Sequence, residues 1–380
     1  MKYTIKQILI ILFITSITLM SIGGFTVFEK LISLDNVELS TEQINIFREF
    51  DSSEVLTLKI NSEDKTIIKE SQNDKLSVSI SGEIKFLDNA KKLSSNLQLD
   101  GHNLEIYRFF DDTQNALFNF ARYEKDLTVT ISIPKSLLLN LEIHRIDSLD
   151  VSGVNFKLIN LDSYDASTIF TNVEAEELKV DFTYGDVKIL NSYFEKISID
   201  RFRYSKLDIK NDNLTSSKQI KKMFLSSSGT SDVKFKNLKI EDLTYKFDSG
   251  DFTIKNSDIV KLKTESYDSN YDFELNNYNL IDIDNSYGDI SLKLKEITQV
   301  KIDSSSSEIN LYIPSSSDTS IVYNTHSGEL SDVNLLLDIT KQTPDTSSTQ
   351  ILIGDLNLAT NKIFVSTEDG NLNIYEYDFE

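Results

Sequence analysis

A short phrase of alternating apolar and polar residues recurs between residues 148 and 311 of this chain. Each copy begins with an acidic or polar residue, and most copies end in asparagine. The copies lie at 148–151, 186–191, 206–211, 232–237, 251–256, 272–277, 289–293 and 308–311. From 186 to 308 their first residues are 20, 26, 19, 21, 17 and 19 positions apart. This repeat constrains the fold more than any other feature, because a period of this length is typical of stacked repeat architectures.

A second alternating segment lies between successive phrases, so each period carries two predicted strands. These segments are 178–180, 197–199, 243–245, 260–262, 280–283 and 300–302. Glycine precedes several phrases and asparagine closes several, and both residue types tolerate the positive φ of a tight turn. The residues concerned are Gly185, Gly250 and Gly288, and Asn191, Asn211, Asn237 and Asn256. We therefore predict an all-β chain whose body is a β-solenoid with about 20 residues in each coil.

A single coil of this length cannot fold by itself. Ordering about 20 residues costs roughly 20–40 kcal/mol of backbone entropy. Burying the five or six apolar side chains of one coil returns only about 8–18 kcal/mol. Hydrogen bonds and packing between coils must supply the difference. A β-sandwich of meandering hairpins is the alternative, but it would not need so regular a register.

The alternating pattern begins near residue 54, with predicted strands at 55–60, 76–80 and 127–133. No later stretch keeps a helical period. Before residue 54 we predict a connector with helical spacing at Glu42, Gln43, Ile44, Ile46, Phe47 and Phe50. The predicted parts are a cytoplasmic stub and transmembrane anchor at 1–28, the connector at 29–53, and an extracytoplasmic β-solenoid domain at 54–380.

The N-terminal segment is predicted to be a membrane anchor. Residues 8–27 form a run of twenty residues without a charge, which as a helix spans about 30 Å, the thickness of a bilayer core. Lys2 and Lys6 precede this run. The positive-inside rule therefore predicts a single-pass protein of the bacterial cell membrane, with its N-terminus in the cytoplasm and its body outside. A cleaved signal peptide, with an apolar stretch at 8–22, is the alternative, and it exports the body equally.

Composition excludes several classes of function. The chain has 39 basic and 60 acidic residues and a net charge of −21, so a general basic surface for nucleic acid is not expected. It has no cysteine, which excludes disulfides, thiolate metal sites and cysteine nucleophiles. Its three histidines, His102, His144 and His326, have no spacing that suits zinc or a catalytic triad. We therefore predict no catalytic residue, no metal and no cofactor.

The longest interval in the repeat contains the only tight basic cluster of the predicted domain. Between Lys206 and Asp232 there are about six extra residues, within 212–224. This segment carries Lys218, Lys221 and Lys222. Insertions in solenoids often carry function, so these lysines form a candidate binding loop. A solvated loop with one helical turn is the alternative.

Two further sets of residues are candidates for binding. The phrases place Asp186, Asp232, Asp251 and Asp289 at equivalent positions. A column of carboxylates could bind a cation or support acid–base chemistry, although turns favour aspartate without any such role. The tyrosines near the phrases are Tyr184, Tyr204, Tyr267, Tyr271 and Tyr287. They could stack on sugar rings along one edge, or pair across coils for stability alone.

Several segments resemble the bacterial putative-adhesin family of exported β-strand repeat domains, a domain of unknown function. They are 97–106 and 127–134 for its opening, 184–186, 249–251 and 287–289 for its repeats, 305–314 for a late coil and 368–374 for its closing coil. Segments 212–224 and 340–350 depart from the pattern. The resemblance spans 54–380 and implies a single-blade β-solenoid in the cell envelope. It implies no activity and no catalytic residues.

These observations favour a membrane-anchored extracytoplasmic β-solenoid that acts as a surface adhesion or envelope interaction and stress module, without catalysis. Its expected partners are the lipid bilayer, through residues 8–27, and an envelope or surface protein or glycan. A carbohydrate-active β-helix enzyme acting on envelope glycans is the alternative function. A purely structural spacer is a third.

Overall fold

The computed structural model of the chain describes residues 40–86, 97–107, 123–212, 218–295, 298–333, 337–342, 350–358 and 360–377. These residues form strands and one 3-10 turn, Ser52–Glu54, with no α-helix among them. The predicted all-β class is thereby confirmed. No helix in the described ranges is long and apolar enough to cross a bilayer. The predicted anchor at 8–27 lies outside these ranges and stays a prediction.

The helical spacing predicted within the connector is wrong. Residues from that segment form an eleven-residue strand, β1 (Ser40–Phe50). Only Ile44 is buried in this strand. Phe47, which would share a face with Ile44 in a helix, is exposed. The pattern was too short to decide between the two periods, and pairing of β1 with β4 (Leu76–Phe86) favours the strand.

The chain divides into two compact units. The smaller unit comprises Met1–Ile44, Gly82–Lys92 and Phe110–Asp126, and its described residues are parts of β1, β4 and β7 (Tyr123–Ile133). Within it, Gln43 Nε2 donates a hydrogen bond of 2.7 Å to Glu83 Oε2. The larger unit comprises Asn45–Ser81, Leu93–Phe109 and Leu127–Glu380, and it contains the solenoid.

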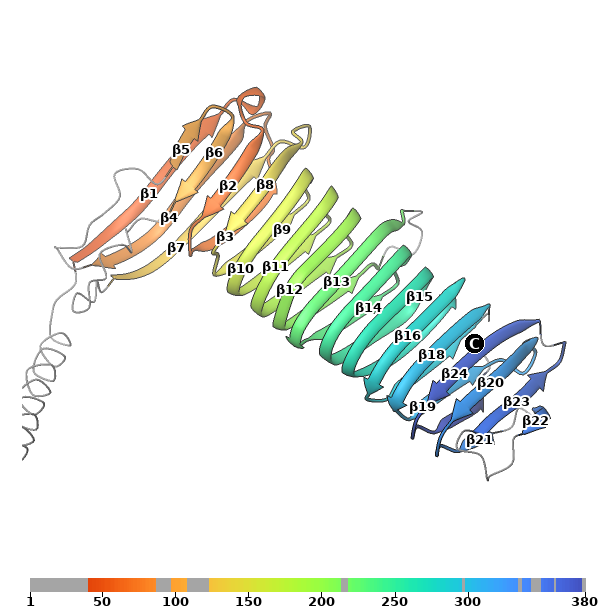
Figure 1. The fold of residues 1–380 in the computed structure, drawn as a ribbon. Coiled ribbons are helices and arrows are strands. Elements are labelled where there is room, and N and C mark those ends of the chain that lie inside the picture. The colour runs from red at the N-terminus through yellow and green to blue at the C-terminus, as the bar shows by residue number, and fades with distance from the viewer. Residues whose placement is uncertain are drawn as a thin grey trace, which may run out of the picture. The chain divides into compact units, whose positions relative to one another are not determined.

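The middle of the larger unit is a stack of coils joined by parallel strand pairs (Figure 1). Its strands are β10 (Asn155–Thr171), β11 (Glu174–Leu190), β12 (Tyr193–Lys210), β13 (Ile220–Thr230), β14 (Asp232–Lys236), β15 (Lys239–Asn277), β16 (Leu280–Tyr287), β17 (Ile290–Leu294), β18 (Gln299–Ser306) and β19 (Ile309–Ile313). Strands such as β10 bend, so that one half pairs in a first sheet and the other half in a second sheet. The longest strand, β15, spans two coils and passes through both sheets twice. The predicted solenoid is confirmed.

Each coil turns twice. In β10, for example, Ile159 and Leu161 lie in the first sheet and Thr168 and Phe170 lie in the second. The turn between the halves, which carries Tyr164, Tyr184 and Tyr204 in successive coils, is called the tyrosine corner below. The turn that leads to the next coil, which carries Asn172, Asn191, Asn237 and Asn256, is called the asparagine corner. The predicted glycine and asparagine turns correspond to these two corners.

Alternation decides which side chains fill the space between the sheets. Apolar residues at every second position of each strand are buried, and polar residues between them face solvent. Aromatic rings continue the packing from coil to coil. The Phe252 ring lies 4.3 Å from that of Tyr245 and 5.0 Å from that of Phe273, measured between ring centres. All three side chains are fully buried, so the core is continuous along the stack.

The register corrects one predicted phrase. Tyr271 pairs with Ile290, which places Asn270 opposite Asp289. The phrase predicted to begin at Asp272 therefore begins slightly earlier, at Asn270. With this start, the unequal intervals on either side of the phrase become equal, because Asn270 lies midway in sequence between Asp251 and Asp289.

Both ends of the solenoid are interleaved. The N-terminal strands are β2 (Thr57–Asn61), β3 (Lys65–Glu70), β5 (Leu97–Asp100), β6 (Asn103–Tyr107), β8 (Leu139–His144) and β9 (Ser148–Ser152). Here β2 lies between β6 and β8, and β3 lies between β7 and β9. The earliest coil in sequence is thus enclosed by later ones, and β5 closes the first sheet by antiparallel pairing with β6.

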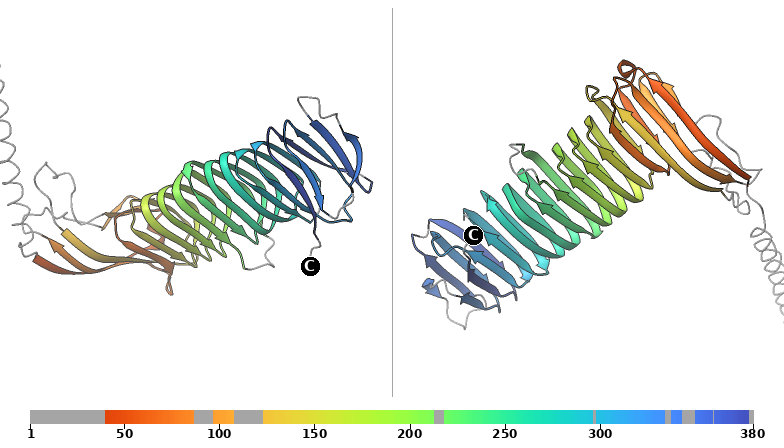
Figure 2. Two further views of the ribbon diagram at one scale, coloured as in Figure 1. Left: turned by 90° about the horizontal axis from the view of Figure 1, so that it is seen from below. Right: turned by 180° about the vertical axis from the view of Figure 1, so that it is seen from behind.

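The C-terminal end repeats this arrangement. Its strands are β20 (Thr319–Thr325), β21 (Leu330–Val333), β22 (Asp338–Gln342), β23 (Gln350–Leu356), β24 (Asn361–Thr367) and β25 (Leu372–Glu376). The last coil inserts between two earlier ones, because β24 pairs with β18 and β20, and β25 pairs with β19 and β21. Beside β20 in the sheet, β23 pairs with β20 and β22 pairs with β23, both antiparallel. The segment 340–350, expected to be a loop, therefore begins with the last residues of β22. Figure 2 shows the stack from two further sides.

Candidate functional site

The basic cluster lies where the sequence placed it, between two coils. In the pairing of β12 with β13, Lys196 lies opposite Lys222. The chain between these partners is longer than in neighbouring coils such as β10 and β11, where Asn155 lies opposite Glu174. Lys218 precedes β13, whereas Lys221 and Lys222 are already within this strand. Residues 213–217 of the predicted loop lie outside the described part of the chain.

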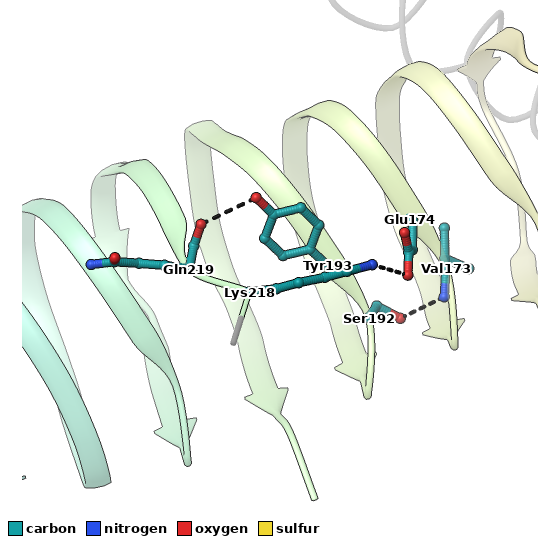
Figure 3. A network of polar contacts seen from close by, with 6 residues as sticks. All are labelled: Val173, Glu174, Ser192, Tyr193, Lys218 and Gln219. Carbon is teal, nitrogen blue, oxygen red and sulfur yellow. Dashed lines mark hydrogen bonds and ion pairs between the residues drawn. The ribbon is translucent and has the colours of Figure 1, made fainter. Parts of the chain in front are cut away.

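Lys218 borders a groove of about 270 Å³ at the asparagine corner. The groove is also lined by Asn172, Asn191, Tyr193 and Lys239. Figure 3 shows the Lys218 side chain extended beside the Tyr193 ring toward Glu174. Its Nζ lies 5.3 Å from the ring centre and forms an ion pair with Glu174. The groove therefore offers an ammonium group, side-chain amides and an aromatic ring, which together can bind a polar ligand.

The corner that positions these side chains is held by local hydrogen bonds. Asn191 has a φ of 51°, in the left-handed region that asparagine tolerates. The next residue, Ser192, accepts a hydrogen bond of 3.0 Å from the Val173 N–H of the preceding coil and donates one of 2.9 Å to the Leu190 carbonyl. The Tyr193 hydroxyl donates to the Gln219 carbonyl at 3.2 Å (Figure 3). The residues flanking the insertion are thus attached to an ordered turn.

The other two lysines of the cluster lie on the first sheet. Lys221 Nζ is 2.8 Å from Glu195 Oε1. This hydrogen bond and the lysine charge hold the pKa of Glu195 below its usual range, and Glu195 raises the pKa of Lys221. Lys222 lies between Lys196 and Asp242 in the register of neighbouring strands. Two of the three predicted lysines therefore have carboxylate partners, and the structure does not bring the three ammonium groups into one pocket.

The predicted acidic column is interrupted. Lys206 lies between Asp186 and Asp232 in the second sheet. Asn270 separates Asp251 from Asp289, donating a hydrogen bond of 3.0 Å to Asp251 Oδ1 and accepting one of 3.0 Å from the Asp289 N–H. Asp232 and Asp251 lie opposite each other, because Val233 pairs with Phe252. On either side of this pair, Lys206 and Asn270 interrupt the stack of carboxylates. Within the described ranges, no group of three or more His, Asp or Glu side chains could hold a metal ion.

The predicted tyrosine edge is present in two parts. Tyr184 and Tyr204 stack with ring centres 5.2 Å apart, and Tyr267 and Tyr287 meet edge to face at 5.2 Å. All four are exposed, whereas Tyr271 is only 2 % exposed and belongs to the core, so its inclusion was wrong. Tyr164 was not among the predicted tyrosines, although its ring centre lies 5.2 Å from that of Tyr184. Its signal was the same spacing in sequence that separates Tyr184 from Tyr204.

Stacked parallel coils with apolar interiors and polar outer columns define this chain as a β-solenoid repeat protein. It belongs to the family described as Toastrack DUF4097, which matches residues 55–223 and 203–375. The resemblance inferred from the sequence is thereby confirmed. The two matches overlap at 203–223, as expected when similar coils repeat along a chain.

Several solved structures are similar to this chain at low identity. A putative cell adhesion protein from Clostridium sporogenes has 10 % identity and a TM-score of 0.18, covering 88 % of this chain and 100 % of its own. A putative adhesin from Bacteroides fragilis has 12 % identity and a TM-score of 0.24, covering 88 % and 98 %. A putative lipid binding protein from Parabacteroides distasonis has 11 % identity and a TM-score of 0.22, covering 90 % and 98 %. No curated protein matches the chain.

Proposed function

We propose that this chain is a non-catalytic surface module, anchored in the bacterial cell membrane by residues 8–27, whose body binds an envelope or surface protein or glycan outside the cell. The observation that carries the proposal is the register of the coils. Outward-facing side chains fall into columns, such as Lys188, Asp208 and Lys234 on the second sheet. A repeated pattern of polar groups suits contact with an extended partner, because many weak contacts can act together.

The net charge of the body also supports a partner outside the cytoplasm that is not a nucleic acid. The predicted body without residues 1–28 has a charge of −21 − 2 = −23, because that segment holds two lysines and no acidic residue. Alternating charges within the columns give local complementarity on an overall acidic surface. Such arrangements favour specificity and steering over high affinity.

Two measurements test the proposal. Protease added to intact cells that express the full-length chain is expected to digest the body and spare an N-terminal tag in the cytoplasm. The full-length chain in lipid nanodiscs is expected to bind isolated cell-envelope fractions without releasing new reducing ends from their glycans. Protection of the body from external protease would contradict the location. Glycan cleavage would instead support the enzyme alternative, and absence of binding to every fraction would support a spacer.

A further inference from the structure

A second groove, which no sequence pattern predicted, lies where the first sheet meets the tyrosine corner. Its volume is about 510 Å³, within the usual range for ligand sites. β13, β15 and β16 supply its walls, which include Ser226, Lys246, Asp248, Tyr267 and Asp284. The groove is therefore built from successive coils and runs across their register.

The groove lies where the row of exposed tyrosines is interrupted, between Tyr204 and Tyr267. Thr230 lies opposite Ser249 in the register of β13 and β15. The two coils between Tyr204 and Tyr267 therefore present Gly229 and Asp248 next to these positions, and neither residue carries a ring. The Tyr204 ring lies over Gly229, whereas Asp248 lines the groove together with Tyr267. The short side chain of Asp248 leaves room beside Tyr267 that a continuous stack of tyrosines would fill.

Tyr267 has the geometry of an aromatic platform. It is 63 % exposed and meets Tyr287 edge to face, with an angle of 69° between the ring planes. In such a pair each ring keeps at least one face away from its partner. Tyr184 and Tyr204, by contrast, stack at 12°, so that each covers one face of the other. Tyr184 also contacts Tyr164, and Tyr204 lies close to Gly229. An uncovered ring face is electron-rich and packs well against polarised C–H groups, such as those on one side of a pyranose ring.

The charges of the groove select among possible sugars. Lys246 Nζ lies 2.7 Å from Glu265 Oε2, and this contact holds the pKa of Glu265 below its usual range. The Lys246 charge is thus already balanced. Asp248 and Asp284 also line the groove. Asp284 interacts electrostatically with Lys301, whose ammonium group is already paired with Asp303 and Asp282. The groove therefore carries surplus negative charge, which attracts an ammonium group and repels a carboxylate or phosphate.

We propose that this groove binds a glycan segment containing amino sugars with free amino groups. A pyranose ring packs on Tyr267, the ammonium group binds Asp248 or Asp284, and serine hydroxyls such as Ser226 bind the sugar hydroxyls. This inference rests on the proposed function, since it names the ligand class for one part of the same surface. It concerns binding alone and involves no covalent step.

Calorimetry with a glucosamine tetramer and the full-length chain in nanodiscs tests the proposal. The wild-type chain is expected to bind the tetramer, and Tyr267→Ala to weaken binding about tenfold. Tyr164→Ala is the matched control, because Tyr164 is 65 % exposed and also meets its neighbour edge to face at 5.2 Å. It is expected to leave binding unchanged. Both tyrosines are exposed, so thermal unfolding of each variant should remain close to that of the wild type.

A second comparison tests whether Asp248 and Asp284 bind the ammonium group of the sugar. Asp248→Asn combined with Asp284→Asn is expected to weaken binding of the glucosamine tetramer and to abolish its preference over the N-acetylated tetramer. A galacturonate tetramer is expected not to bind. Equal binding of Tyr267→Ala and the wild type, or a preference for the N-acetylated or the acidic sugar, would overturn the proposal.

Failure of this assignment can be distinguished from failure of the proposed function. If the chain binds envelope fractions but not the glucosamine tetramer, the groove assignment is wrong and the surface function stands. If it binds the tetramer through Tyr267 but no envelope fraction, the groove assignment stands and the surface function is wrong.

Discussion

The asparagine corner and the tyrosine corner make the same change of direction by different means. At the asparagine corner Asn172, Asn191, Asn237 and Asn256 have φ values of 49–57°, so one left-handed residue makes the turn. At the tyrosine corner Gly185, Gly250 and Gly288 have φ values of 93–133°. There a Cβ would lie 1.9–2.4 Å from a carbonyl oxygen of the preceding coil. The first corner is thus determined by its own backbone. The second also has left-handed residues, Tyr184 and Tyr204 with φ values of 56° and 50°, but it depends in addition on the close approach of a neighbouring coil.

At the tyrosine corner, the close approach of a glycine to a carbonyl group of the preceding coil recurs in every second coil. Gly250 and Gly288 face the carbonyl groups of Ser231 and Ser269, and Gly370 faces that of Ser307. These serines are evenly spaced in sequence, at twice the coil period. From Ser231 to Gly370, glycine and serine therefore alternate from coil to coil, whereas Ser205 and Ser231 lie in successive coils with no glycine between them. We infer that the tyrosine corner couples neighbouring coils in pairs, whereas each asparagine turn can be substituted with mainly local effects.

Gly250→Ala is expected to have the largest effect. The new methyl group would lie 1.9 Å from the Ser231 carbonyl oxygen, at a φ of 130° that alanine rarely adopts. Strain and displacement of the neighbouring coil should destabilise the fold by about 3 kcal/mol or more. Urea unfolding of the full-length chain in micelles, followed by circular dichroism, measures this change.

Gly229→Ala is the matched control for Gly250→Ala at the same corner. Its φ is not positive, and its new Cβ would lie 3.6 Å from the Tyr204 ring, an ordinary contact. It should be neutral, or stabilising by up to about 1 kcal/mol, because alanine restricts the unfolded chain. If both substitutions had equal effects, close approach would not distinguish this corner.

Most of the regular part of this fold could be predicted from the sequence, because burial imposes alternation and stacking imposes a period. The phrase start at Asn270 could not. Moving a strand by two residues leaves every side chain on the same face, so the hydrophobic pattern cannot separate Asn270 from Asp272. The interleaved ends could not be predicted either. Pairing of β2 with β6 and β8 is a long-range choice that no local pattern records.

The candidate sites were predicted less well for a related reason. The lysine cluster and the tyrosine edge leave visible signals in sequence, namely like charges in an insertion and a repeated spacing. The ion pairs of Lys218 with Glu174 and of Lys221 with Glu195 join residues 44 and 26 positions apart. The groove at Tyr267 depends on the lack of an aromatic ring in the neighbouring coil, which has Asp248 there. Neither feature is visible until the register is known.

Ser257→Ala is expected to have the next largest effect, at the asparagine corner. The buried Ser257 hydroxyl accepts a hydrogen bond of 3.1 Å from the Leu238 N–H and donates one of 2.9 Å to the Lys255 carbonyl. Its removal leaves a buried N–H without this partner and should destabilise the fold by about 1–3 kcal/mol. The same urea experiment with Ser291→Ala, on the outer side of the second sheet, provides the control. A loss below that of the control would show that this corner does not need its hydroxyl bridge.

Asn256→Ala should have a smaller effect, of about 1 kcal/mol, because alanine tolerates a φ of 49° less well than asparagine. Asn256→Gly is the informative partner, since glycine adopts this conformation freely and should change the free energy of unfolding by a few tenths of a kcal/mol. If Asn256→Gly destabilised the fold as much as Gly250→Ala, the asparagine side chain would couple the coils and the contrast between corners would disappear.

Tyr204→Asn should have the smallest effect, and it tests whether the corners are interchangeable. Tyr204 has a φ of 50°, in the region where a bulky side chain costs about 1–2 kcal/mol. Asparagine relieves part of this strain but removes the ring stacked on Tyr184, which contributes about 0.5–1.5 kcal/mol. The two effects should nearly cancel, leaving a net change within about 0.5 kcal/mol. Tyr204→Ala keeps most of the strain and loses the stack, so it should be less stable than Tyr204→Asn in the same urea experiment. Equal stability of the two variants would show that asparagine does not relieve the left-handed strain at this corner, and the two corners would then not be interchangeable.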